Sequence, residues 1–138
     1  MSRLLAIDYG TKRVGLAVTD PQQIIATALD TVPAATVLDY LKKYVATEPV
    51  TAFVLGMPRR LDGSPTDATP HVTGFARRLQ QTFPEVPVHL VNEQFSSRLA
   101  QQAMRDGGLK KKDRQNKATV DKVSAVIILQ FFLESRGQ

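Results

Sequence analysis

The stretch LLAIDYGTKRVGLAV, from Leu4 to Val18, predicts how the fold begins. It holds two short apolar runs, and the residues between them, Tyr9-Gly10-Thr11-Lys12, have the composition of a turn. We therefore expect a β-hairpin with strands over Arg3–Asp8 and Val14–Thr19. The first strand ends in an acid, which makes Asp8 a candidate functional residue.

Strands and helices alternate along the rest of the chain. Apolar runs and turn residues predict three further strands, within Ile24–Val32, at Thr51–Gly56 and at Val86–Val91. Helical periodicity predicts a helix over Val37–Val45, one from about Asp67 to Phe83 and one over Thr119–Ser135. A short helix from Ser96 or Ser97 to Met104 and a basic loop at Gly107–Lys117 are expected between the last strand and the last helix. The order is βββαβαβαα. Because helices connect the later strands, we expect an α/β protein with a five-stranded mixed sheet flanked by helices.

Composition narrows the class of protein. A chain of 138 residues fits one domain, expected to span residues 1–138. The net charge of +5 favours acidic partners, nucleic acid before anionic membranes. The absence of cysteine fits a reducing compartment. No apolar run approaches the roughly 18 residues of a membrane span, so we expect a cytoplasmic protein without membrane partners.

Three acids are candidate catalytic residues. Asp8 and Glu93 each follow a predicted strand, where ligand sites of open α/β sheets lie. Asp121 lies in an otherwise apolar helix, opposite the polar Gln130, on the side that carries Ser124, Ala125 and Ile128. The structural alternatives are that the strand-end acids begin turns, and that Asp121 lies in the first turn of a helix with Thr119 as its N-cap and interacts there with the helix dipole.

Three converging carboxylates would repel one another unless a cation lies among them. Oxygen ligands suit Mg²⁺ or Mn²⁺, ions that activate water and stabilise the departing oxygen in phosphodiester cleavage. The three acids therefore predict a metal-dependent nuclease site.

Basic residues are candidates for phosphate contacts. They cluster in the loop before Asp121 and after strand ends, although such a run can also be a solvated surface. The set is Lys12, Arg13, Arg59, Arg60, Arg98, Lys110, Lys111, Lys112, Arg114 and Lys117. Aromatic residues are too few to suggest a stacking platform for bases. His89, which alternates with apolar neighbours, is expected to be packed and hydrogen-bonded, and His71 to be exposed.

Four segments, LLAIDYGTKRVGLAVTD, VLGMPRRLDGSPT, VNEQFSSR and KATVDKVSAVIIL, together resemble the YqgF family over nearly the whole chain. This family, also called RuvX, has a ribonuclease-H-like fold and is related to Holliday-junction resolvases of the RuvC type. The resemblance implies that Asp8, Glu93 and Asp121 form the catalytic and metal-binding set of a nuclease in the 5′-end maturation of pre-16S rRNA. Two features depart from the relatives: Asn92-Glu93-Gln94 replaces the usual Asp-Glu-Arg, and Gly56-Met57-Pro58 stands where resolvases carry an acid.

Other functions remain open from the sequence. One is a resolvase-like DNA nuclease in recombination or repair, and another is a non-catalytic ribosome-assembly factor that binds nucleic acid. The Asp-x-Gly-Thr pattern at Asp8 also occurs in actin-like and sugar-kinase ATPases, but those hold nucleotide between two domains and this chain supplies one. The expected partner is structured RNA or branched DNA, and the protein is a monomer or, as a two-strand resolvase, a homodimer.

Overall fold

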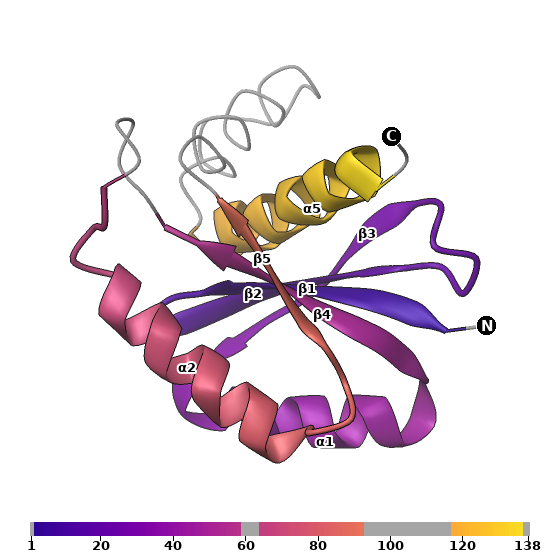
Figure 1. Ribbon diagram of the computed structural model, residues 1–138, viewed down its shortest axis with the longest axis horizontal. Helices are drawn as coiled ribbons and strands as arrows, with labels where there is room; N and C mark the ends of the chain where they lie inside the picture. Colours follow the sequence, from indigo (N-terminus) through magenta and orange to yellow (C-terminus); the bar gives the residue numbers. More distant parts are fainter. Residues whose placement is uncertain (1, 59–63, 93–116, 137–138) are drawn as a thin grey trace.

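The computed structural model describes residues 2–58, 64–92 and 117–136, without the side chains of residues 117–121. Its centre is a five-stranded mixed sheet in the order β3-β2-β1-β4-β5 (Figure 1). The strands are β1 (Arg3–Tyr9), β2 (Arg13–Thr19), β3 (Ala26–Pro33), β4 (Val50–Met57) and β5 (Val88–Asn92). β1 pairs antiparallel with β2 and parallel with β4, and β4 pairs parallel with β5. The predicted hairpin and five-stranded mixed sheet are thus confirmed.

Helices cover both faces of the sheet. α1 (Val37–Thr47), preceded by a 3₁₀ turn at Ala34–Thr36, connects β3 to β4, and α2 (Thr69–Thr82) connects β4 to β5. These two helices lie on one face, whereas α5 (Lys117–Arg136) crosses the other face (Figure 1). Pro70 lies in the first turn of α2, where its missing N–H costs no helical hydrogen bond.

The strands alternate their side chains between two apolar layers. Leu5 and Ile7 of β1 pack with α1 and α2, and Leu4 and Ala6 pack with α5. The layer under α5 includes three alanines of the sheet, Ala6, Ala17 and Ala52. Because alanine side chains are short, α5 can lie close to the strands. β1 is buried on both faces and holds its terminal residues in a rigid frame.

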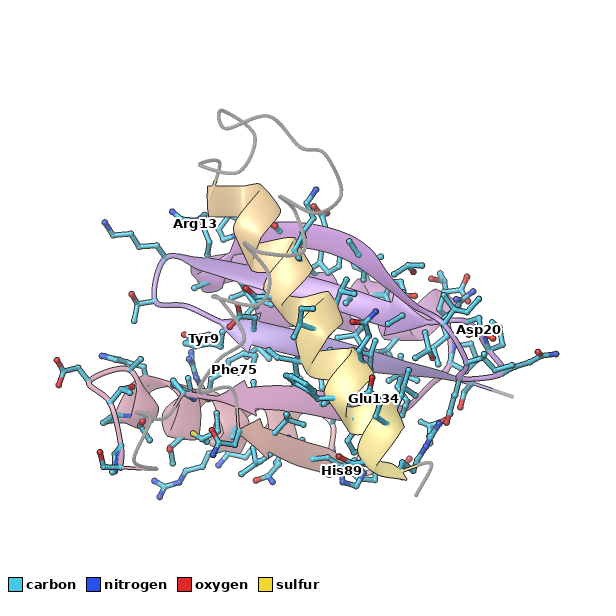
Figure 2. The ribbon with its side chains drawn as sticks, turned by 90° about the horizontal axis from the view of Figure 1, so that it is seen from above. Tyr9, Arg13, Asp20, Phe75, His89 and Glu134 are labelled. Carbon is cyan, nitrogen blue, oxygen red and sulfur yellow. The ribbon has the colours of Figure 1, made fainter. Side chains whose placement is uncertain are left out.

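The direction of α5 follows from contacts near its end. The Arg136 guanidinium donates to the backbone carbonyl of Gln23 at 3.3 Å, and the Gln23 side-chain amide donates to the carbonyl of Ser2 at 2.9 Å. Arg136 therefore lies beside the beginning of β1, so α5 runs antiparallel to β1 and its first turns point toward the end of β1. Figure 2 shows α5 crossing the sheet, with Glu134 far from Arg13.

The described residues include no helix long and apolar enough to cross a membrane. The short helix expected from Ser96 or Ser97 to Met104 lies outside the described residues, as does the loop at Gly107–Lys117 except for Lys117, which is already helical. The single domain over residues 1–138 stays a prediction.

Candidate active site at the carboxyl edge of the sheet

The parallel strands β1, β4 and β5 end at one edge of the sheet, at Tyr9, Met57 and Asn92. Asp8 is the penultimate residue of β1, and Glu93 directly follows Asn92 in the sequence. Neighbouring strands lie about 4.8 Å apart, so the ends of β1 and β5, with β4 between them, are about 10 Å apart. The end of β1, which carries Asp8, and the end of β5, which Glu93 follows in the sequence, thus lie at the same edge.

Asp8 belongs to the face of the sheet that α5 covers. It continues the alternation of Leu4 and Ala6, which pack with α5. The next residue, Tyr9, faces the other way, because its ring stacks on Phe75 of α2 at a centroid distance of 4.3 Å and an interplanar angle of 17°. Asp8 is half-buried, so a rigid strand holds this residue while part of its surface stays accessible at the edge.

Glycines flank Asp8 in both neighbouring strands. Gly15 of β2 is its direct cross-strand partner. On the other side the β1–β4 register pairs Ile7 with Leu55, so the next step sets Asp8 beside Gly56. Residues that pair directly share a face of the sheet, and neither glycine has a side chain to cover it. The two direct cross-strand neighbours of Asp8 therefore place no side chains of their own beside its carboxylate.

Backbone hydrogen bonds fix the conformation of the β1–β2 turn at this edge. The Gly10 N–H donates to the Arg13 carbonyl at 2.9 Å, and the Ala34 N–H donates to the Lys12 carbonyl at 3.0 Å. A Cβ on Gly10 would lie 2.6 Å from the Arg13 carbonyl oxygen, so this close approach requires glycine. The turn presents Lys12 as an exposed cation and Arg13 as a half-buried one, both near Asp8.

The inward face of α5 agrees with the sequence periodicity. Ser124, Ala125 and Ile128 are buried and Gln130 is exposed, as predicted. Position 121 lies one turn before Ser124 and Ala125 on that face, although the Asp121 side chain is outside the described residues. The expected N-cap is wrong: Lys117 and Ala118 are already helical, so Thr119 lies inside α5.

Several predicted site residues lie outside the described residues. They are Glu93, Arg59, Arg60, Arg98, Lys110, Lys111, Lys112 and Arg114, together with the side chain of Lys117. The structure therefore places Asp8, Lys12 and Arg13 at the edge and leaves the convergence of the three acids a prediction. Within residues 2–58, 64–92 and 122–136, no group of three or more His, Cys, Asp or Glu side chains could hold a metal ion.

Two features were missed or misjudged from the sequence. An Arg78 N–H donates to the Tyr9 hydroxyl at 3.2 Å, an interaction across 69 residues whose local signal is the Phe75–Arg78 spacing of one helical turn. His89 is exposed rather than packed, because β5 is an edge strand, and its ring lies 5.1 Å from that of Phe132. His71 is exposed, as expected.

The sheet order, the face covered by α5 and the acid at the edge define a ribonuclease-H-like α/β protein. RuvC of Thermus thermophilus in complex with a Holliday junction substrate has this architecture: it matches 99% of this chain and 96% of its own at a TM-score of 0.60. A second Thermus thermophilus RuvC structure matches with a TM-score of 0.53. At 17% identity, both similarities show the fold alone.

Sequence comparison identifies the family. The family model described as "RuvX: Holliday junction resolvase" matches residues 2–135, so this chain belongs to the RuvX family. A protein of Phocaeicola vulgatus is 53% identical over 136 residues, which cover 99% of this chain and 98% of the relative. A protein of Porphyromonas gingivalis is 51% identical over 135 residues, with 98% of each chain covered. Both relatives carry the name "Putative pre-16S rRNA nuclease".

Proposed function

We propose that this protein is a divalent-metal-dependent nuclease that hydrolyses phosphodiester bonds in the 5′-end maturation of pre-16S rRNA. The observation that carries the proposal is the name shared by relatives about half identical to the chain over almost its full length. The architecture supports it, because a half-buried carboxylate, Asp8, lies between glycines at the edge where the parallel strands end. A cytoplasmic location stays a prediction.

Asp8, Glu93 and Asp121 are the proposed catalytic and metal-binding residues. The level of Asp121 supports its inclusion: from Arg136 back to Asp121 the helix rises about 22 Å, and from Ser2 to Asp8 the strand rises about 20 Å. Because Arg136 is linked to Ser2 through Gln23, these similar lengths support a position for residue 121 near the level of Asp8. Strand alternation after His89 and Val91 would put position 93 on the same face.

The donor set fits a hard divalent cation. Membership of the family implies a divalent metal ion in general, and we propose Mg²⁺ or Mn²⁺ because all three candidate ligands are carboxylates. Such an ion supplies a Lewis acid and an activated water. The chain's own contribution would be to hold the three carboxylates together, with Asp8 fixed in β1 beside Gly15 and Gly56.

The predicted basic set would hold the nucleic-acid backbone. Lys12 and Arg13 lie on the turn next to Asp8, where they can contact phosphates that flank the cleaved bond. Holliday-junction cleavage is a second candidate function, favoured by the description of the family model and by the RuvC fold. Resolving a junction cuts two strands, so that activity would require a homodimer, whereas rRNA cleavage can proceed in a monomer.

Cleavage by acid-to-amide variants tests the site. Asp8→Asn and Asp121→Asn should lose Mn²⁺-dependent cleavage of a pre-16S rRNA fragment, whereas Glu134→Gln, an exposed acid at the far end of α5, should behave like the parent (Figure 2). EDTA should stop cleavage by the parent. Parent cleavage that continues in EDTA, or that survives in both Asp variants, would contradict the proposal.

A melting experiment tests the metal site without substrate. Bound metal stabilises the native state by RT ln(1 + [L]/Kd), so millimolar Mn²⁺ should raise the melting temperature of the parent. In EDTA, Asp121→Asn should melt at or above the parent temperature because it relieves repulsion between carboxylates. It should also lose most of the rise with Mn²⁺. A variant that is less stable in EDTA but gains as much from Mn²⁺ as the parent would remove Asp121 from the site.

A further inference from the structure

We propose a second phosphate-binding site for the nucleic-acid backbone, formed by Arg78 and the bare helix surface at Gly74, on the face of the sheet opposite to α5. The inference rests on the proposed function, since it concerns the same substrate. The proposed site adds Arg78, a cation on the α2 side of the edge, to the candidate basic set.

Arg78 is held in a fixed orientation at this edge. One of its terminal N–H groups donates to the Tyr9 hydroxyl at 3.2 Å, and its guanidinium carbon lies 5.7 Å from the centroid of the Phe75 ring. Phe75 is fully buried and stacks on Tyr9, so the surface below the guanidinium is rigid. A guanidinium has five N–H donors, and the hydrogen bond to Tyr9 uses one of them. A pre-oriented arginine loses less conformational entropy when it binds a phosphate.

In the part of the chain that the structure describes, no acid neutralises the charge of Arg78. Among the described residues, no carboxylate lies within 4.0 Å of this guanidinium, and the Arg78 side chain is exposed. An exposed, ordered arginine without an acidic partner fits an anionic ligand. Since Tyr9 follows Asp8 directly, this cation lies near the candidate catalytic edge but on the other face of the sheet.

Gly74 supplies an independent observation. It lies in the middle of α2, one helical turn before Arg78, and a Cβ at this position would meet nothing within 4 Å. Glycine in a helix interior costs about 0.5–1 kcal/mol relative to alanine, and here no packing among the described residues requires it. A bare helix surface beside an arginine allows the backbone of a ligand to approach closely.

The two faces together suggest how the substrate lies. Tyr9 and Phe75 lie at the same end of the molecule as Arg13, away from Asp20 and Glu134 (Figure 2). Successive phosphates on one strand of a duplex rise about 3.4 Å, so a phosphate at Arg78 would lie within a few nucleotides of the bond cleaved near Asp8. The nucleic acid would therefore cross the sheet edge and touch both α2 and the β1–β2 turn.

Salt-dependent binding tests this site. Affinity for a fluorescein-labelled RNA hairpin and for a DNA four-way junction is measured in EDTA, where cleavage is stopped, between 50 and 300 mM salt. Removing one cation that binds a phosphate makes the negative slope of log affinity against log salt shallower by about 0.7–0.9, and it weakens affinity about five- to eightfold at 0.1 M salt. Arg78→Ala should show both changes, the shallower slope and the weaker affinity. Arg77→Ala, which removes the same charge from the preceding position of α2, should show clearly smaller changes.

A second pair of variants separates weaker binding from loss of stability. Gly74→Leu fills the bare surface with a better helix former, so it should raise the melting temperature and still weaken binding. Gln80→Leu, an exposed control on the same helix, should leave binding unchanged. The site is refuted if Arg78→Ala and Gly74→Leu bind like the parent, or if Arg77→Ala matches Arg78→Ala, because net charge alone would then be responsible. A parent that binds neither probe would refute the proposed function as well.

Discussion

Replacing Gly10 by alanine should destabilise the fold by an amount that follows from the turn geometry. The new Cβ would lie 2.6 Å from the Arg13 carbonyl oxygen, a backbone atom that already accepts the Gly10 N–H at 2.9 Å. Relieving the overlap requires this hydrogen bond to lengthen or break, at a cost of about 0.5–1.5 kcal/mol. Overpacking adds about 1–3 kcal/mol. We therefore expect Gly10→Ala to lower the free energy of unfolding by about 2–4 kcal/mol.

Gly74→Ala is the matched control, because it makes the same chemical change where nothing lies within 4 Å of the added carbon. Its expected effect has the opposite sign, a gain of about 0.5–1 kcal/mol. For a chain of this length the unfolding entropy makes 1 kcal/mol worth about 3–4 °C. Thermal unfolding followed by circular dichroism in EDTA should show Gly10→Ala lower by about 7–13 °C and Gly74→Ala higher by about 2–3 °C. A Gly10→Ala melting temperature within 1 °C of the parent would refute this account of the turn.

Three further variants have defined outcomes. Ser124→Ala should raise the free energy of unfolding by about 1 kcal/mol in urea titrations, because the buried Ser124 hydroxyl has no hydrogen-bond partner among the described residues; a decrease would show that the hydroxyl is satisfied. The N–H groups of Ile25, Ile24 and Gln22 hold the pKa of Asp20 below its usual 3.8, so its stabilising effect is present above pH 3.8 and disappears as the pH falls toward the lowered value. The urea midpoints of the parent and Asp20→Asn should therefore differ more at pH 7 than at pH 3, and an equal difference would contradict this account. Alanine at all four basic positions before α5 should reduce the salt slope of RNA binding by somewhat under one unit for each of these side chains that binds a phosphate, whereas an unchanged slope would identify a solvated surface; the positions are Lys110, Lys111, Lys112 and Arg114.

The elements that could be predicted from the sequence are those set by local patterns, namely apolar runs, turn residues and helical periodicity. The short apolar run before Asp8 and the turn residues after it predicted the strand that became β1, and the 100° spacing in α5 correctly set Ser124 and Ile128 inward and Gln130 outward. The 3₁₀ turn at Ala34–Thr36 was not predicted, because it is stabilised by a distant residue: the backbone carbonyl of Lys12, in the hairpin, accepts a hydrogen bond from the Ala34 N–H. Helix and strand boundaries depend on such neighbours.

The parts of the site that escaped sequence reasoning depend on long-range interactions. The hydrogen bond from Arg78 to Tyr9 joins α2 to β1; the spacing of Phe75 and Arg78 sets these two residues on one helix face, but it does not specify Tyr9 as the partner. His89 was expected to be packed because its neighbours are apolar, but the position of β5 at the edge of the sheet leaves both His89 and Leu90 exposed. Thr119 suits an N-cap by residue type, yet α5 includes the two residues before it. Strand order and tertiary packing decided each of these cases.

The coverage of one sheet face by α5 has a consequence for the order of events during synthesis. All five strands precede α5 in the chain, so Leu4, Ala6 and Val54 lack this cover until the helix has been translated. At about 5–20 residues per second, the chain from Asn92 to Arg136 takes about 2–9 s to make. During this interval the apolar face of the nascent sheet can bind other unfolded chains, and α5, which carries position 121, has not yet packed on it. A chain released before α5 would therefore be a substrate for chaperones and proteases, and any nuclease activity that needs Asp121 would begin only after α5 has covered this face of the sheet.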